Sequence, residues 1–257
     1  MDNIVQNSVV VNLSRRPATV EVGPFVIGWD PGTDSRYVNY ATPRVGAAVR
    51  AADVVALVAA FRRIDRVPRL EYVTSCAPTL EERLLAAGFT VEARHDYLTC
   101  TPESLVLPGV PAGVEIAEPV TDDEWAGVIA AQNEAFGGEP VATPEDVARL
   151  RRTGEAGGVV LSARDVAGHH LGGGAASPPG AGVSEVTGIA VREPYRRRGI
   201  AAALTGAITE RLFATGADAA WLEASGENSW RVYERVGYAP TGKRLYFALD
   251  GTTSEGN

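Results

Sequence analysis

The sequence predicts an α+β fold in which strands and helices are mixed, organised as about one and a half domains. Segments with the two-residue alternation of strands alternate with segments that have the three- and four-residue apolar spacing of helices. A stretch rich in proline and glycine, Thr101–Gly113, separates two such series. One pattern of elements also occurs twice, at an offset of 149 residues. A chain of 257 residues is longer than one average domain and shorter than two.

Composition narrows the class of protein. Hydrophobic residues make up 45% and charged residues 22%, as in an ordinary soluble globular protein. No apolar run reaches the length of a membrane span, and the N-terminus lacks a signal-peptide pattern, so we expect no membrane association. The net charge of −8 makes general nucleic-acid binding a poor hypothesis.

The distribution of charges and the two cysteines give further information about the class of protein. The chain through Glu103 carries a net charge of −1 and the remainder −7. Lys243 is the single lysine among 24 basic residues, which is typical of a GC-rich bacterial genome. Cys76 and Cys100 are the two cysteines. We expect them to be free thiols in the cytoplasm.

In the first half, apolar periodicity gives two helices and several short strands. Proline stands in the first turn of the second helix and Gly88 ends it. The predicted strands are Thr19–Ile27, Tyr37–Ala41, Leu70–Thr74 and two within Phe89–Cys100, and the predicted helices are Val45–Ile64 and Pro78–Ala87.

After Gly113 the pattern begins again. Thr121 and Glu124 fit a capping box at the start of a helix. The predicted strands are Val114–Ala117, Val159–Ala163, Leu171–Ser177, Val183–Val191, Ala219–Ala224 and Leu245–Leu249. The predicted helices are Thr121–Ala135, Pro144–Arg152, Ile200–Ala214 and Ser229–Val236, and we expect 251–257 to be frayed.

The internal repeat relates Leu70–Cys100 to Ala219–Leu249. In both, a strand is followed by a polar turn, a helix, a glycine with an aromatic residue, and a strand region. Two copies of one supersecondary unit indicate two related folds in one chain. The other interpretation is an unrelated α/β cap on the second half.

The segment from Glu185 to Ala201 carries the clearest chemistry. An apolar strand leads through a basic turn with Gly199 directly into a helix. Unpaired backbone N–H groups and the positive end of the helix dipole then point at one place, which favours a phosphate. The alternative is a solvated basic cap on a surface helix.

Two motifs resemble those of the GNAT superfamily, the Gcn5-related N-acetyltransferases. Arg196-x-x-Gly199-x-Ala201 satisfies the family's acyl-CoA motif Q/R-x-x-G-x-G/A. Downstream, Tyr233-Glu-Arg-Val-Gly237-Tyr238 resembles the family's Y-E-x-x-G-F helix end. The resemblance covers Val114 to about Leu249. It implies a GNAT fold, a central mostly antiparallel mixed sheet flanked by helices, here in a tandem arrangement.

The resemblance also implies the cofactor site. The amides around the basic turn would bind the pyrophosphate of acetyl-CoA or another short acyl-CoA, and the edge of the preceding strand would pair with pantetheine. Asn228 is a further candidate, although it precedes Tyr233 by five residues where the family's CoA-contacting Asn often precedes it by seven; the alternative is a helix cap. The cofactor-binding candidates are Ile189, Ala190, Val191, Arg196, Arg197, Arg198, Gly199, Ile200, Ala201, Ala202 and Asn228.

Two side chains are candidates for catalysis. Tyr233 stands where the family commonly keeps a tyrosine near the CoA sulfur, and its phenol can supply a proton; the alternative is a core aromatic. Glu185 precedes Val191 by six residues, where one branch of the family keeps its catalytic glutamate. Strand alternation predicts Glu185 on the same face as Thr187, Ile189 and Val191. The alternative for Glu185 is a solvated strand end, with another group or water as base.

Other candidates are weaker. His169 and His170 lack Cys, Asp or Glu at ligand spacing, so we expect a solvated turn and no metal. Glu134, Phe136 and the loop 137–141 fall where the family places acceptor-binding residues. In the first half, Ala47 and Arg50 stand at the positions equivalent to Arg196 and Gly199.

We therefore expect three parts: a degenerate, truncated GNAT-like domain (1–105), a linker (106–113) and a catalytic GNAT domain (114–257). The expected activity is acyl transfer, most simply acetyl from acetyl-CoA to a primary amine of a small molecule, by direct attack in a ternary complex. The alternatives are a non-catalytic acyl-CoA sensor and a protein or peptide N-acetyltransferase. We expect no nucleic-acid or membrane partner, and a monomer or homodimer.

Overall fold

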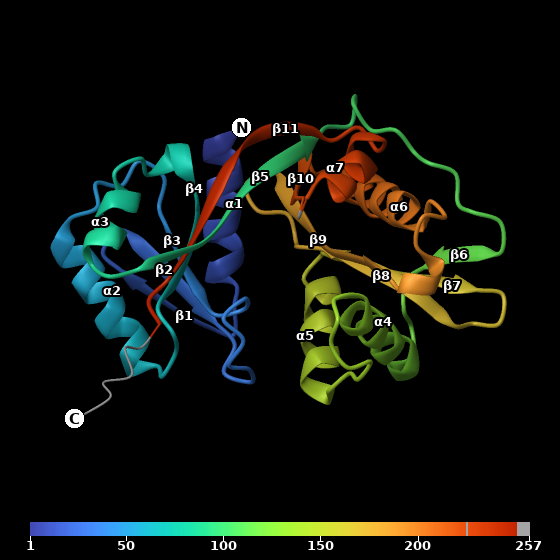
Figure 1. The fold of residues 1–257 in the computed structure, drawn as a ribbon, viewed down its shortest axis with the longest axis horizontal. Coiled ribbons are helices and arrows are strands. Elements are labelled where there is room, and N and C mark those ends of the chain that lie inside the picture. Colours follow the sequence, from blue (N-terminus) through green and yellow to red (C-terminus); the bar gives the residue numbers. More distant parts are fainter. Residues whose placement is uncertain (225, 251–257) are drawn as a thin grey trace. The chain divides into compact units, whose positions relative to one another are not determined.

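The chain divides into two compact units (Figure 1). The computed structural model describes residues 1–224 and 226–250, without the side chains of residues 227 and 228. Unit 1 is Met1–Asp96 together with the chain from Thr241 onward, and unit 2 is Tyr97–Pro240. The predicted frayed segment 251–257 lies outside the described residues.

Unit 1 is a mixed sheet with helices on both faces. Its strand order is β1-β2-β3-β4-β11, in which β3 and β4 are parallel and the other neighbours antiparallel. Gly28 of β2 faces α1, whereas its neighbour Ile27 packs with α2 and α3, so the helices cover opposite faces. The elements are α1 (Asp2–Ser14), β1 (Ala18–Val22), β2 (Phe25–Trp29), β3 (Tyr40–Pro43), α2 (Ala51–Arg63), β4 (Arg69–Val73), α3 (Leu80–Ala86) and the start of β5 (Thr90–Cys100).

Unit 2 repeats this plan with a larger sheet, in the order β5-β10-β9-β8-β7-β6. The parallel pair is β9 with β10. Helices α6 and α7 pack on one face of the sheet, and α4 packs on the other. The elements are β6 (Val114–Ala117), α4 (Asp122–Ala135), α5 (Pro144–Glu155), β7 (Val159–Asp165), β8 (His170–Ala176), β9 (Val183–Val191), α6 (Ile200–Ala214), β10 (Ala219–Glu223), α7 (Glu227–Glu234) and the start of β11 (Ala239–Ala248).

Strands β5 and β11 each belong to both units. The end of β5, Tyr97–Cys100, pairs with β10 in unit 2. The end of β11, Arg244–Ala248, pairs with β4 in unit 1. Each of the two strands thus begins in one unit and ends in the sheet of the other.

The units therefore differ from the predicted segments 1–105 and 114–257. Strand exchange assigns the C-terminal strand to unit 1, and no local sequence signal reports an exchange of this kind. The predicted linker 106–113 is part of unit 2. It runs along α6, where Pro108 lies against Gly206 and Pro111 lies near Gly199.

Most elements lie where periodicity predicts them, with three clear exceptions. The predicted strand Thr19–Ile27 is two strands, β1 and β2, which pair with each other antiparallel. The sequence analysis assigns no element to residues 2–14, which form helix α1 with Val5, Val9 and Leu13 packed in the core. The two strands predicted within Phe89–Cys100 are one continuous strand, β5. The predicted mixed sheet flanked by helices is confirmed.

Both cysteines are free and buried. Among the described residues, no helix is long and apolar enough to cross a membrane.

Gly237 shows how tightly the segment after β5 packs on unit 2. Its φ is +95°, and a Cβ here would overlap the carbonyl oxygen of Ser104. The amide of Val106 also donates to the carbonyl of Val236, at 3.0 Å. A side chain at Gly237 would therefore meet both backbone strain and a steric clash.

We expect Gly237→Ala to lower the free energy of unfolding by about 2–4 kcal/mol, the sum of left-handed strain and overpacking. Gly216→Ala is the matched control, because Gly216 also has a left-handed φ, +91°, but open space around its Cβ. Its cost is expected to be about 1 kcal/mol. Urea unfolding of both variants measures the difference, and equal losses would show that the contact with Ser104 is unimportant.

Candidate functional site

The parallel strands β9 and β10 separate part-way along their length. Their paired residues are Val183 with Ala219, Ser184 with Ala220, and Glu185 with Trp221. Beyond Glu185, the described part of β9 is paired with β8 on its other side. One backbone edge of β9 is therefore available from Val186 onward, within an otherwise paired sheet.

A β-bulge lies in this free part of β9. Gly173 of β8 pairs with Ala190 and Ala175 pairs with Thr187, so three residue steps on β9 oppose two on β8. Gly188 occupies the extra position with a φ of +65°, a conformation that few residues other than glycine adopt. A bulge bends its strand and increases its twist, which suits a strand that leaves its neighbour.

Gln132 of α4 holds the bulge in place. Its Nε2 donates to the carbonyl oxygen of Gly188 at 2.7 Å. A Cβ on Gly188 would lie 2.7 Å from that nitrogen, and a Cβ on Gly173 would press on Val128 beside it. Two glycines thus leave the space that Gln132 needs to reach the strand. The sequence analysis did not select Gln132, because glutamine is common in helices, although a glycine inside a strand is a signal for a bulge.

The bulge changes which face of the sheet each side chain occupies. Thr187 stands opposite Ala175, which packs with Val128 of α4. Ile189 instead meets Gly174 on the α6 side, and Val191 packs there with Ile208. The predicted common face of Glu185, Thr187, Ile189 and Val191 is wrong. Glu185 and Thr187 face α4, because the extra residue shifts the alternation before Ile189 is reached.

The turn between β9 and α6 presents backbone N–H groups. After a short 3-10 turn at Glu193–Tyr195, Arg197 has a φ of +62° and Gly199, the N-cap of α6, a φ of +84°. The first N–H groups of a helix have no acceptor within it, and amides in such a turn form a concavity that binds anions. Ile200–Ala202 supply the first-turn amides of α6.

The three arginines of the turn have different surroundings. Arg196 donates from Nε to the carbonyl of Val191 at 3.0 Å and from Nη2 to the carbonyl of Ala135 at 2.8 Å. It therefore fixes the turn against the end of β9 and the end of α4. Arg197 and Arg198 are exposed, and Arg198 lies 5.4 Å from the ring centroid of Tyr195. Their charge is available to an anion at the turn.

Tyr233 lies in the hydrophobic cluster of unit 2, which also contains Val191 and Ile200. It is 9% exposed and meets Tyr238 edge to face, with ring centroids 6.3 Å apart. Burial raises the pKa of the Tyr233 phenol above its usual 10, so the group stays protonated across physiological pH. This suits a proton donor, and it also agrees with the alternative of a core aromatic.

Glu185 lies in the last residue pair before the strands separate. It is half-buried, its N–H donates to Ser177 Oγ at 3.0 Å, and its carbonyl accepts from the N–H of Ser177 at 2.8 Å. Its partner across the parallel pair, Trp221, is buried. The backbone of Glu185 is thus held by Ser177, at the beginning of the free edge of β9.

The remaining candidates separate into two groups. The side chain of Asn228 lies outside the described residues, so its role stays a prediction.

The prediction of a solvated turn is wrong for His170. This residue begins β8 and is half-buried against α4, and its Nδ1 lies 2.7 Å from Ser162 Oγ. Burial lowers the pKa of His170. His169 is exposed and pairs with Asp165. Within residues 1–224 and 226–250, no group of His, Cys, Asp and Glu could hold a metal ion.

Comparisons with known proteins identify the family of one domain and the fold of the chain. Residues 125–238 match the model of the acetyltransferase (GNAT) family. A GCN5-related N-acetyltransferase from Kribbella flavida is similar over 99% of this chain and 97% of its own, with 25% identity and a TM-score of 0.81. One from Sphaerobacter thermophilus is similar over 96% and 90%, with 17% identity and a TM-score of 0.64.

A tandem GNAT protein from the clavulanic acid biosynthesis pathway is similar over 95% of this chain and 88% of its own, with 16% identity and a TM-score of 0.64. No curated protein matches the sequence significantly. The chain contains a GNAT-family domain at residues 125–238, and its fold is that of GCN5-related N-acetyltransferases, tandem members included. The resemblance indicated by the two motifs is confirmed.

Members of this family are acyl-CoA-dependent N-acetyltransferases that generally use acetyl-CoA. The protein therefore falls in this general class of acyltransferase.

Proposed function

We propose that this protein transfers an acetyl group from acetyl-CoA to a primary amine of a small molecule, by direct attack in a ternary complex. One observation carries the proposal. The free edge of β9 leads within a few residues to the N-terminus of α6, where Gly199 caps the helix without a side chain. A free strand edge followed by a helix N-terminus suits a long ligand that has amides at one end and phosphates at the other.

The residues present fit acetyl-CoA. The amides from Arg197 to Ala202 would accept the pyrophosphate, with Arg197 and Arg198 adding charge. The amides of pantetheine would pair with the free edge at Ile189 and Ala190. The backbone carbonyl of Val191 already accepts a hydrogen bond from Arg196, so we do not assign this carbonyl a bond to pantetheine.

The reaction forms a C–N bond and breaks the C–S bond of the thioester that acetyl-CoA supplies. The amine must lose a proton, and the departing thiolate must gain one. We assign the first step to Glu185, at the start of the free edge, and the second to Tyr233, whose phenol is kept protonated by burial. Backbone N–H groups at the bulge would stabilise negative charge on the acyl oxygen.

The acceptor would approach from the side of the connection between α4 and α5. Phe136 at the end of α4 is 67% exposed, and Glu134 pairs with Arg192 at 3.0 Å. The part of the chain after Glu103 carries a net charge of −7, which would favour cationic amines by steering.

The proposal is tested by thermal stability and turnover. Acetyl-CoA at one hundred times its dissociation constant is expected to stabilise the protein by about 2.7 kcal/mol. Gly199→Asp places a carboxylate at the phosphate site and is expected to abolish the effect. Gly216→Asp, with a similar backbone conformation in open space, is the control.

A screen of amines with thiol release as readout then identifies the acceptor. An unchanged melting temperature with acetyl-CoA would refute the cofactor; stabilisation without turnover of any amine would favour a sensor.

We expect Tyr233→Phe to lower kcat about 100-fold, because the departing thiolate loses its proton donor. The melting temperature changes little, since phenylalanine fills the same space. Because burial raises the pKa of Tyr233, we expect no loss of activity from ionisation of its phenol near neutral pH. Tyr238→Phe is the control: it removes the 2.7 Å bond to Thr209 Oγ1 and should cost about 1 kcal/mol of stability without affecting kcat. Wild-type kcat in Tyr233→Phe would exclude Tyr233 as the acid.

We expect Glu185→Gln to lower kcat/KM about 100-fold and to remove the loss of activity at acidic pH that comes from protonating the base. Raising the pH should partly restore the rate, because more of the amine is then already deprotonated. The exposed Glu210 on α6 supplies the control substitution, Glu210→Gln. An unchanged pH–rate profile in Glu185→Gln would assign the base to another group.

A further inference from the structure

Unit 1 repeats the plan of unit 2 but differs where the cofactor would bind. At an offset of 149 residues, α2 corresponds to α6, β4 to β10, α3 to α7, and β5 to β11. In both units a parallel strand pair flanks the first of these helices along the chain: β3 precedes α2 and β4 follows it, and β9 precedes α6 and β10 follows it. The two parallel pairs can therefore be compared directly.

The position between β3 and β4 is occupied by a side chain of the protein itself. Beyond the pair Ala41 and Leu70, Gln6 of α1 lies between the two strands and is fully buried. Its Nε2 donates to Thr42 Oγ1 and to the carbonyl of Pro43, each at 2.7 Å. Its Oε1 accepts from the N–H of Val73 at 2.8 Å.

The carboxamide of Gln6 thus satisfies backbone groups on both strands. A primary amide offers the same donor and acceptor as the peptide-like amides of pantetheine. Strand β3 is also short: it has 4 residues, Tyr40–Pro43, whereas β9 has 9 residues and contains the bulge. Unit 1 therefore lacks both the free edge and the space that unit 2 keeps.

The helix that follows is closed as well. At the N-terminus of α2, Asp53 Oδ2 accepts from the N–H of Arg50 at 2.8 Å and from its Nε at 3.1 Å. These hydrogen bonds lower the pKa of Asp53, so a negative charge stands at the helix start. Asp53 also pairs with the guanidinium of Arg50 at 3.0 Å, so this ion pair occupies the start of α2, whereas at the same offset α6 has Gly199 in place of Arg50 and Ala202 in place of Asp53.

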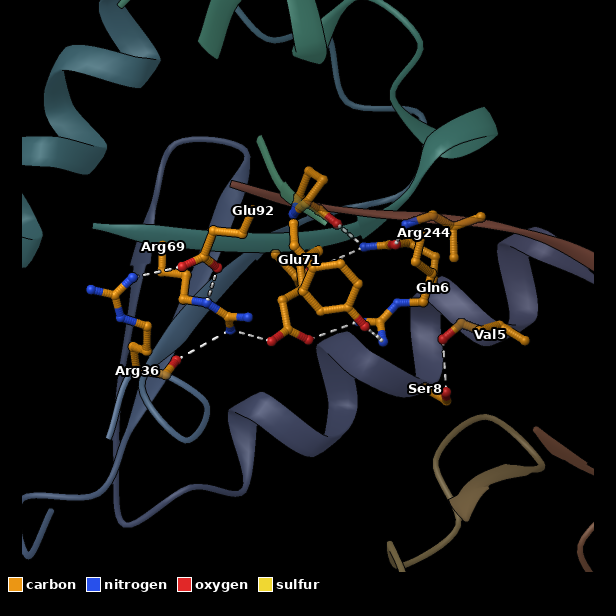
Figure 2. A network of polar contacts seen from close by, with 12 residues as sticks. Val5, Gln6, Ser8, Arg36, Arg69, Glu71, Glu92 and Arg244 are labelled. Carbon is orange, nitrogen blue, oxygen red and sulfur yellow. Dashed lines mark hydrogen bonds and ion pairs between the residues drawn. The ribbon is translucent and has the colours of Figure 1, made fainter. Parts of the chain in front are cut away.

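Gln6 is held by a buried polar network (Figure 2). Thr42 Oγ1 donates onward to the carbonyl of Glu71 at 2.7 Å. The carboxylate of Glu71 pairs with Arg69 and with Arg244, the latter at 3.1 Å, and all three are buried. Opening this region would leave charges without their partners, which is costly.

We propose that Gln6 acts as a built-in ligand that permanently fills the cofactor position of unit 1, so that the chain binds one acyl-CoA, in unit 2. This rests on the proposed function of unit 2. Unit 1 then keeps its fold without a cofactor, because Gln6 supplies the hydrogen bonds that an acyl-CoA would otherwise make.

Hydrogen exchange of the whole chain with and without acetyl-CoA, together with calorimetric stoichiometry, tests the proposal. We expect one equivalent bound and protection of peptides covering 186–202. Peptides covering 40–53 and 70–76 should not change. Two equivalents, or protection in 40–53, would overturn the inference. Protection in neither unit would instead overturn the proposed function.

The role of Gln6 is tested separately, without acetyl-CoA. Gln6→Leu removes the amide, and we expect exchange at Val73 to rise at least tenfold while the affinity of unit 2 for acetyl-CoA stays as in wild type. The exposed neighbour variant Asn7→Ala is the control. If Gln6→Leu does not fold, Gln6→Met replaces it, because methionine is close to glutamine in length and also lacks the amide that accepts from Val73. Wild-type exchange at Val73 in the folded variant would overturn the assignment of Gln6.

Discussion

The separation of β9 from β10 after Glu185 and Trp221 is the feature on which the site of unit 2 depends. It frees a backbone edge inside a sheet, where unpaired polar groups are normally costly. The bulge at Gly188 bends the strand away, and Gln132 satisfies the carbonyl that the bulge displaces. The same bend moves Ile189 and Val191 to the face opposite Glu185.

The two units show that one fold can be either open or closed at the same place. In the described part of unit 2, Gln132 and Arg196 bond to two carbonyls of β9 after its separation from β10, and Gly199 caps α6 without a side chain, so an edge and a helix N-terminus remain that suit a ligand. In unit 1, Gln6 pairs with both strands and Asp53 caps the helix. The polar groups are the same in kind, but the protein itself supplies their partners. Fold alone therefore does not assign an activity to a unit, and the local partners decide.

Much of the site could be predicted from local sequence. Arg196, Gly199 and Ala201 identify the phosphate turn because a glycine at a helix start and the amides around it act within a few residues. The helix that carries Tyr233 is likewise visible from its pattern and from Gly237. Gln6 and Gln132 could not be found in this way. Each is an ordinary polar residue in a helix, and its role arises from a strand that lies distant in the sequence.

By itself, the sequence determined the elements, the repeat, the family and the basic turn, because these depend on periodicity and on short motifs. Tertiary structure decided three other matters. Packing made residues 2–14 a helix, strand exchange placed β11 in unit 1, and one extra residue in β9 reversed the face of Ile189. Each of these depends on hydrogen bonds or contacts between segments that lie far apart in the sequence. The free energy of such contacts cannot be predicted from any short stretch of the sequence alone.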